Sequence, residues 1–252
     1  MTSRAFAYAQ ARLQARFGEQ PGAGVWDSLQ TLVELPALLE QIRLTSLRHW
    51  IVNISVSTPA HEMERLLRRR LRALVDEVAN WLPAEWRAAV RWTEILPDLP
   101  ALAHLLQGGE ARSWMADETA LQELARLEPA LRARAALQSR FAPLLPFADG
   151  ETLGMRWLAE WRRRWPGGSK SERAALEQLI ARTQAHVGQF AADRSTSGWA
   201  ARKRFQAEVT FLFRRRALTA AAAFAWLLLA AIEVERVRAA IIERAHFAPG
   251  AH

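Results

Sequence analysis

The residues best able to do chemistry in this sequence are its carboxylates and histidines, and neither group forms a recognisable catalytic pattern. The acidic residues from Glu62 to Glu77 alternate with arginines at helical spacing, so charge pairing along one helix explains them. His61 and Glu62 begin like a zinc-protease motif, but Arg65 stands where the second histidine would be. No carboxylate dyad for acid–base catalysis is therefore predicted.

The sequence also contains no pattern that supports a cofactor-binding or metal-binding site. The six histidines show no metal-ligand spacing, and the sequence has no nucleophile elbow, phosphate-binding loop or dinucleotide fingerprint. The absence of cysteine excludes disulfides, thiolate metal sites and cysteine nucleophiles. We therefore expect a protein that is not an enzyme, with no catalytic residues, no cofactor and no metal.

The charge balance is basic. Lys and Arg together number 34 against 26 Asp and Glu, a formal net charge of +8, and only Lys170 and Lys203 are lysine. Such a basic surface could bind nucleic acid, anionic lipid or an acidic protein. The arginines alternate with glutamates on predicted helices, which favours solvated helix faces. The N-terminus has no apolar signal region, so the cytoplasm is the expected compartment.

One stretch is a sharper candidate for nucleic-acid binding. Arg162, Arg163 and Arg164 are flanked by Trp161 and Trp165, and aromatic rings beside basic groups can stack bases and hold phosphates. These tryptophans, with the one four residues earlier, recur at helical spacing, which predicts a buried stripe with arginine on its outer side. The buried stripe is favoured, and nucleic acid is an unlikely partner.

The elements that must position these residues are nearly all helices separated by Pro and Gly. Ser57 and Thr58 before Pro59 predict a helix start, while Ile51 to Ser57 alternates like a strand and is interpreted as a short helix or linker. The predicted helices cover 4–17, 25–45 with a break at Pro36, 57–82, 84–96, 99–106, 114–127, 129–141, 151–165, 169–190 and a long segment over 205–247.

We therefore expect an all-α fold, a multi-helix bundle of pseudo-repeated helical units with a long C-terminal helix. Glu64 to Pro83 and Glu128 to Pro146 share an acidic start, a Leu-Arg run and a Leu-Pro stop, a weak sign of repetition. A single domain over 1–252 is expected, with 1–108 and 109–252 as its helical units if it divides.

The final segment, Phe205 to Phe247, contains neither Pro nor Gly, and its centre from Ala217 to Ile232 is apolar on every face. Such a helix must be buried in protein or in lipid. Sixteen residues span about 24 Å, short of a bilayer core of about 30 Å, and charged residues flank both ends. Burial among other helices is the prediction, and insertion in a membrane is the alternative.

Three stretches resemble the family of C/d-type subunits found in V-type rotary ATPases. Tyr8 to Phe17 (YAQARLQARF) is similar to the family's opening motif, and Leu38 to Arg72 is similar to the segment and helix that follow. Ala225 to Phe247 resembles the family's closing helix, with Glu233, Glu235 and Arg238 at its charged positions. Most of Ala111 to Trp199 is not covered by the resemblance.

The resemblance implies a non-catalytic coupler that links the central stalk to the proteolipid ring of a rotary ATPase, or serves a related membrane complex, and so supports ATP-driven proton or ion transport. It would lie on the inner face of the cell membrane. The alternative is a soluble, Arg-rich interaction or regulatory protein of another complex, with a nucleic acid or protein partner. Partner-binding residues are expected among Glu62, Arg65, Arg69, Arg162, Arg163, Glu233, Glu235 and Arg238.

Overall fold

The computed structural model describes residues 2–145, 151–167, 170–192 and 198–247, and these are helical with no strand among them, which confirms the predicted all-α class. The elements are α1 Thr2–Ala5, α2 Ala7–Gly18, α3 Ala23–Gln30, α4 Leu35–Arg43, η1 Ser46–Trp50, α5 Ala60–Trp81, α6 Ala84–Arg91, η2 Trp92–Asp98, α7 Leu99–Leu106, α8 Ser113–Asp117, α9 Gln122–Arg126, α10 Pro129–Ala136, η3 Ala142–Leu144, α11 Leu153–Arg163, α12 Lys170–Ala192, α13 Gly198–Arg215 and α14 Ala220–Phe247.

The chain divides into two compact units. Unit 1 combines residues 1–87 with 167–252, and unit 2 consists of residues 88–166. The boundaries of these units fall at 87/88 and 166/167. The sequence predicts a single domain over 1–252, with a boundary after residue 108 if it divides. Unit 1 is discontinuous, because it is assembled from segments on both sides of unit 2.

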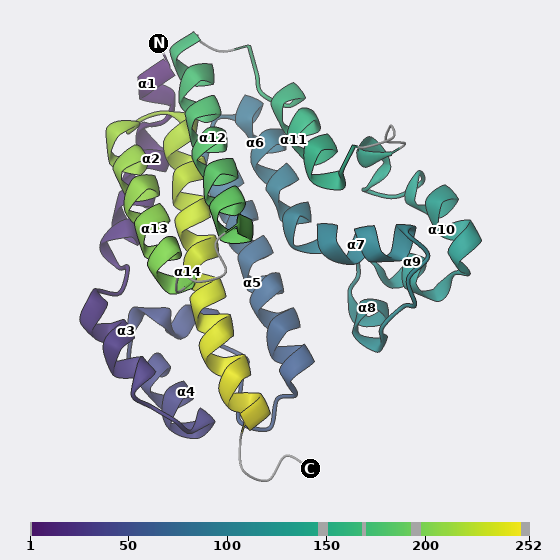
Figure 1. Cartoon of the computed structure of the whole chain (residues 1–252). Coiled ribbons are helices and arrows are strands. Elements are labelled where there is room, and N and C mark those ends of the chain that lie inside the picture. The colour runs from purple at the N-terminus through teal and green to yellow at the C-terminus, as the bar shows by residue number, and fades with distance from the viewer. Residues whose placement is uncertain (1, 146–150, 168–169, 193–197, 248–252) are drawn as a thin grey trace. The chain divides into compact units, whose positions relative to one another are not determined.

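Unit 1 is built around α14, the long C-terminal helix predicted from the sequence. This helix packs against α13, α5, α12, α2 and α4, and Figure 1 shows it running beside α13 and α5. Ala220 to Ala230 are buried except for the half-buried Leu228, which confirms burial for most of the predicted apolar span. Ala217 and Leu218, at its start, are exposed. Among the described residues, no helix is long and apolar enough to span a bilayer.

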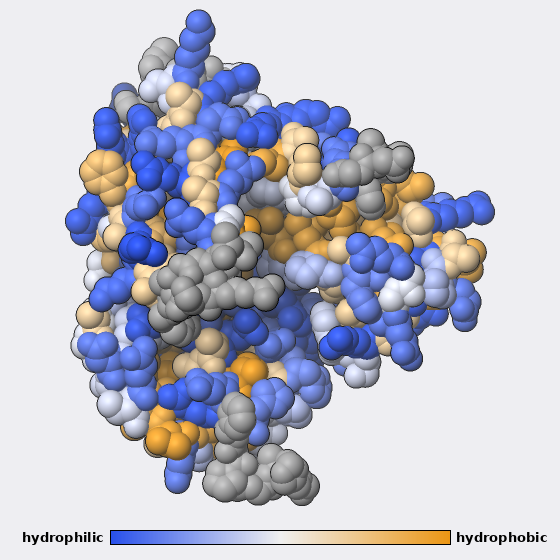
Figure 2. All heavy atoms as spheres, viewed as in Figure 1, coloured by the Kyte–Doolittle hydropathy of each residue, from blue (hydrophilic) through white to orange (hydrophobic). Residues whose placement is uncertain are grey.

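Side chains on the outer helices of unit 1 are mostly polar. Figure 2 shows mainly hydrophilic residues over the outward faces of α12 and α13. Their inward faces carry buried residues such as Leu176 and Phe213. This one-sided pattern is what an amphipathic helix on the outside of a bundle requires.

The segment over 205–247 is not one continuous helix. It turns between α13 and α14, where Leu218 adopts a left-handed φ of 62°. Two side chains from other helices bind the backbone of this turn: Gln10 Oε1 accepts from Leu218 N at 2.9 Å, and Glu172 Oε1 accepts from Ala220 N at 3.2 Å. Side chains of other helices therefore cap the backbone N–H groups that the break leaves without helical partners.

Several predicted boundaries were wrong for local reasons. The break expected at Pro36 lies before it, because Pro36 is accepted in the first turn of α4. The helix predicted from Ser57 starts instead at Ala60, and Thr58 Oγ1 accepts from Ser55 N (2.9 Å) rather than capping it. Residues 51–57 form turns, and Arg43 Nη2 donates a hydrogen bond of 2.9 Å to Ile54 O within this segment.

The helices predicted over 114–127 and 129–141 are shorter in the structure. The first is divided into α8 and α9 by the non-helical residues 118–121, and the second ends as α10 at Ala136, after which Ser139 Oγ donates to Ala136 O (2.8 Å). Serine bonded in this way competes with helix continuation.

Unit 2 is held by tryptophan side chains. Trp92 Nε1 donates to Trp157 O and Trp157 Nε1 donates to Trp92 O, each at 3.1 Å, so η2 and α11 are joined reciprocally. Trp161 Nε1 donates to Ala89 O at 3.1 Å. Trp161 and Trp165 are buried at 4% and 9% exposure, which confirms that both belong to an inward stripe.

Candidate functional site

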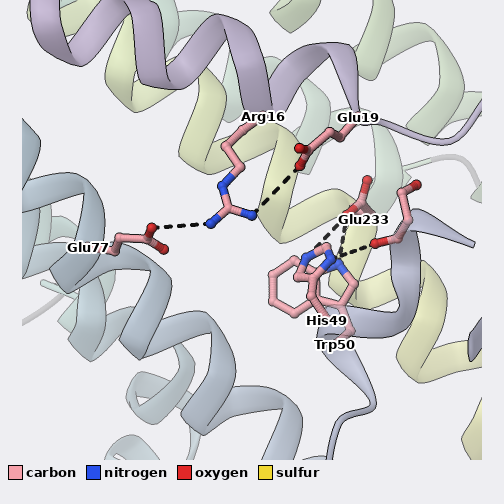
Figure 3. Close-up of polar contacts among 7 residues, drawn as sticks. Arg16, Glu19, His49, Trp50, Glu77 and Glu233 are labelled. Carbon is pink, nitrogen blue, oxygen red and sulfur yellow. Dashed lines mark hydrogen bonds and ion pairs between the residues drawn. The ribbon is translucent and has the colours of Figure 1, made fainter.

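A small cavity lined by several charged residues lies in unit 1 where α2, η1, α5 and α14 meet. It has a volume of about 30 Å³, enough for roughly two water molecules. Figure 3 shows four of its lining residues, Arg16, Glu19, His49 and Glu233, with their polar contacts. The lining residues are Arg16, Glu19, Gln20, Ser46, His49, Arg70, Leu74, Trp226 and Glu233.

Glu233 is the most buried carboxylate of this cavity, with 12% of its side chain exposed. Its Oε1 accepts a hydrogen bond of 2.7 Å from Trp50 Nε1 on η1. Burial raises the pKa of Glu233, and the Trp50 bond opposes that rise only in part. The carboxyl group is therefore shifted towards its protonated form.

His49 lies beside Glu233, and one of its nitrogens is fixed by the backbone. Nδ1 is 2.7 Å from Ser46 O, and since a carbonyl only accepts, Nδ1 carries the hydrogen. Nε2 lies 3.9 Å from Glu233 Oε1. Burial lowers the pKa of His49, and Arg70 and Arg16 lower it further against the opposing Ser46 bond.

The two arginines of the cavity differ in their partners. Arg16 on α2 contacts Glu77 on α5 at 3.2 Å and Glu19 at 3.7 Å, as Figure 3 shows. Half-buried Arg70 makes no ion pair or hydrogen bond with another described residue. The cavity thus holds one guanidinium that is engaged by carboxylates and one that is available to water.

Six of the predicted partner-binding residues lie on the adjoining helices α5 and α14. Glu62 and Arg65 pair with each other through bonds of 2.6 and 2.8 Å, and the hydrogen bond from Arg65 lowers the pKa of Glu62. Arg69 is exposed and has no ion pair among the described residues. Arg238 bridges the two helices.

Arg238 Nη1 contacts Glu64 Oε1 on α5 at 2.9 Å, while its Nε contacts Glu235 Oε2 at 3.0 Å. The Glu235 side chain remains 50% exposed. Glu233, the sixth predicted residue of unit 1, faces the cavity instead of the surface. The predicted set in this unit therefore contains one buried polar centre and one surface row of charges.

Arg162 and Arg163 belong to unit 2. Both are exposed, and Arg163 contacts the buried Glu160 at 2.6 Å with 76% of its side chain still accessible. Arg164 contacts the same carboxylate at 2.6 Å and lies 4.2 Å from the centre of the Trp92 ring. The arginine run is thus partly tied to the surface of its own unit.

Sequence reasoning missed most of the cavity. His49 was considered only for metal-ligand spacing, and Arg16, Arg70 and Trp226 were not singled out as site residues. The available signal was the resemblance itself, because Arg16, His49 and Glu233 all fall within the three matching stretches. Among the described residues, no group of His, Cys, Asp or Glu is arranged to hold a metal ion.

No protein-family model, no curated protein and no solved structure matches this chain.

Proposed function

We propose that this protein is a non-catalytic structural coupler similar to the C/d-type subunits of V-type ATPases. It would link a central stalk to a proteolipid ring, on the cytoplasmic side of a membrane, and so support ATP-driven proton or ion transport. The proposal starts from the three matching stretches, which lie at both ends of the sequence.

The observation that carries the proposal is that these three stretches pack together in unit 1. Arg16 of the first stretch reaches Glu77, just beyond the second, at 3.2 Å. Trp50 of the second donates to Glu233 of the third across 183 residues of sequence, and Arg238 contacts Glu64 across 174. Family motifs that meet in one core are what a shared fold would require.

A coupler needs rigid helices and a surface that other proteins of the complex can grip. The buried span of α14 between α13 and α5 supplies rigidity, because close-packed interiors transmit force without collapsing. Exposed Arg69 and half-exposed Glu235, on the adjoining helices α5 and α14, supply a surface row of charges. Charged rows of this kind give specificity to protein–protein contacts.

Affinity purification from membranes tests the proposal directly. The tagged protein should recover central-stalk and proteolipid-ring proteins, identified by mass spectrometry. A double charge reversal, Arg69→Glu with Glu235→Arg, should reduce that recovery about tenfold, a loss of roughly 1.4 kcal/mol. Arg173→Glu, on the exposed face of α12, is the matched control and should leave recovery unchanged.

Recovery of neither class of protein would contradict the proposed role. Alkaline carbonate extraction adds an independent result, because a peripheral coupler is released into the supernatant. Retention in the membrane pellet would contradict a peripheral position.

No structural observation favours the alternative of a nucleic-acid regulator. The rings beside the arginine run are buried, at 4% for Trp161 and 9% for Trp165, so they do not form an exposed stacking surface. A gel-shift assay at increasing salt tests the alternative, because affinity through phosphate contacts falls steeply with salt concentration.

A further inference from the structure

The cavity beside α14 brings two titratable groups, Glu233 and His49, close together. Glu233 Oε1 and His49 Nε2 are 3.9 Å apart, which is longer than a direct hydrogen bond. The cavity of about 30 Å³ that both residues line has room for a bridging water. A proton can therefore pass between Glu233 and His49 through a bridging water, or directly after a small rotation of the carboxyl group.

The hydrogen bonds around this pair leave two proton acceptors facing each other. Because His49 Nδ1 donates to Ser46 O, the neutral imidazole has only a lone pair at Nε2. Glu233 Oε1 accepts a hydrogen bond from Trp50 Nε1, and Oε2 has no hydrogen-bond partner among the described residues. A lone pair opposite a carboxylate is unfavourable unless one proton lies on one of the two groups.

The charges around the pair come from two other helices, α2 and α5, and from the residue that follows α2. Arg16 and Glu19 face the cavity from α2 and the residue that follows it, and Arg70 faces it from α5. Arg16 makes ion pairs with Glu77 and Glu19, whereas Arg70 has no ion pair in the described chain. Helices α4, α12 and α13 also pack against α14 but add no charged side chain to the described cavity lining.

We propose that Glu233 and His49 form a half-buried site that binds a single proton between them, reached through the water-sized cavity. In the one-proton state the proton is on the carboxyl group with a neutral imidazole, or on Nε2 with a carboxylate. A second proton charges the imidazole while the carboxyl stays neutral. Loss of the only proton of the one-proton state leaves the Glu233 carboxylate facing the lone pair of His49 Nε2. The site is independent of the proposed coupling role.

NMR titration of the whole protein tests this site. The side-chain carboxyl ¹³C signal of Glu233 and the ring ¹⁵N signals of His49 are followed from about pH 3 to 9. Both should report one common step, above the ordinary glutamate midpoint of about 4.3, because interacting groups titrate as a pair.

Two variants identify the residues responsible. Glu233→Gln keeps an acceptor for Trp50 but holds no proton, so the common step should disappear from the His49 signal. Glu235→Gln removes a half-exposed carboxyl from the same helix and should leave the step unchanged. A Glu233 signal that titrates near 4.3 with no step shared by His49 would overturn the proposal, and this result needs only the wild-type protein.

Discussion

Glu233 and His49 make the stability of unit 1 depend on pH in opposite directions. Burial raises the pKa of Glu233 in the folded protein, so the folded state holds this proton more tightly than the unfolded chain. Burial lowers the pKa of His49, so stability from this residue is lost as pH falls below its unfolded value of about 6.5. The contribution of Glu233 is greatest below about 4.5 and declines as pH rises through the folded pKa.

Replacing Glu233 by Gln should therefore stabilise the protein at neutral pH. The amide oxygen can still accept from Trp50 Nε1, and no charge needs to be buried. We expect a gain of about 1.4 kcal/mol for each pH unit by which folding raises the wild-type pKa. Urea unfolding at pH 4.5 and pH 8 measures this gain, which should be present at pH 8 and nearly absent at pH 4.5.

Glu235→Gln is the control for this experiment, since its carboxyl is half exposed and its contact with Arg238 lies at the surface. Its effect should be below about 0.5 kcal/mol at both pH values. Equal destabilisation by Glu233→Gln at both pH values would mean that the Glu233 carboxylate is accommodated without a charge penalty.

For single residues, the sequence predicted which side chains belong to the site in some cases, but not whether those side chains are buried. The resemblance groups three charged residues of the last helix, Glu233, Glu235 and Arg238. Only the fold shows that Glu233 is 12% exposed, whereas Glu235 is 50% exposed and pairs with Arg238 at the surface. The Trp50 donor lies 183 residues away in sequence, so no local pattern could have predicted it.

The turn between α13 and α14 shows how one element depends on others. Local helix propensity predicts that 205–247 continues, because the turn contains neither Pro nor Gly. Gln10 on α2 and Glu172 on α12 bind the backbone N–H groups at the turn instead. Local sequence patterns cannot reveal caps supplied from such distant helices.

Leu218 occupies the left-handed region at this turn, where a side chain carries a conformational penalty of about 1 kcal/mol. Leu218→Gly should preserve or slightly increase the free energy of unfolding, since glycine adopts this φ freely. Leu218→Val should lower it by about 1 kcal/mol relative to Leu218→Gly, because β-branching is least compatible with positive φ. Chemical denaturation of both variants measures the order, and a more stable valine variant would contradict the strain at Leu218.

Across the whole chain, fold class was predictable and domain division was not. Apolar residues at helical spacing, separated by Pro and Gly, are sufficient to predict an all-α protein. The division at residues 87/88 and 166/167 depends on which helices contact each other after folding. Near its first boundary α6 continues from Ala84 to Arg91, so the sequence has no break there.

The packing of α14 gives a test at this scale. Ala222 is fully buried in the alanine-rich first turns of α14, which pack in the core of unit 1. Ala222→Leu should lower the free energy of unfolding by about 1–3 kcal/mol, because a close-packed core does not accept added methylenes. Ala174→Leu, at an exposed position of α12, should change it by less than about 0.5 kcal/mol. Equal effects of the two substitutions would contradict close packing around Ala222.

The discontinuity of unit 1 has a consequence during synthesis on the ribosome. Residues 88–166 emerge as one contiguous stretch and can fold before translation ends, whereas the partners of α2 and α5 on α14 are translated last among the described elements. Until then, apolar residues such as Leu13 and Val78 lack their final neighbours. The nascent chain therefore exposes apolar surface of unit 1 until α14 is translated, a condition that favours aggregation and chaperone binding.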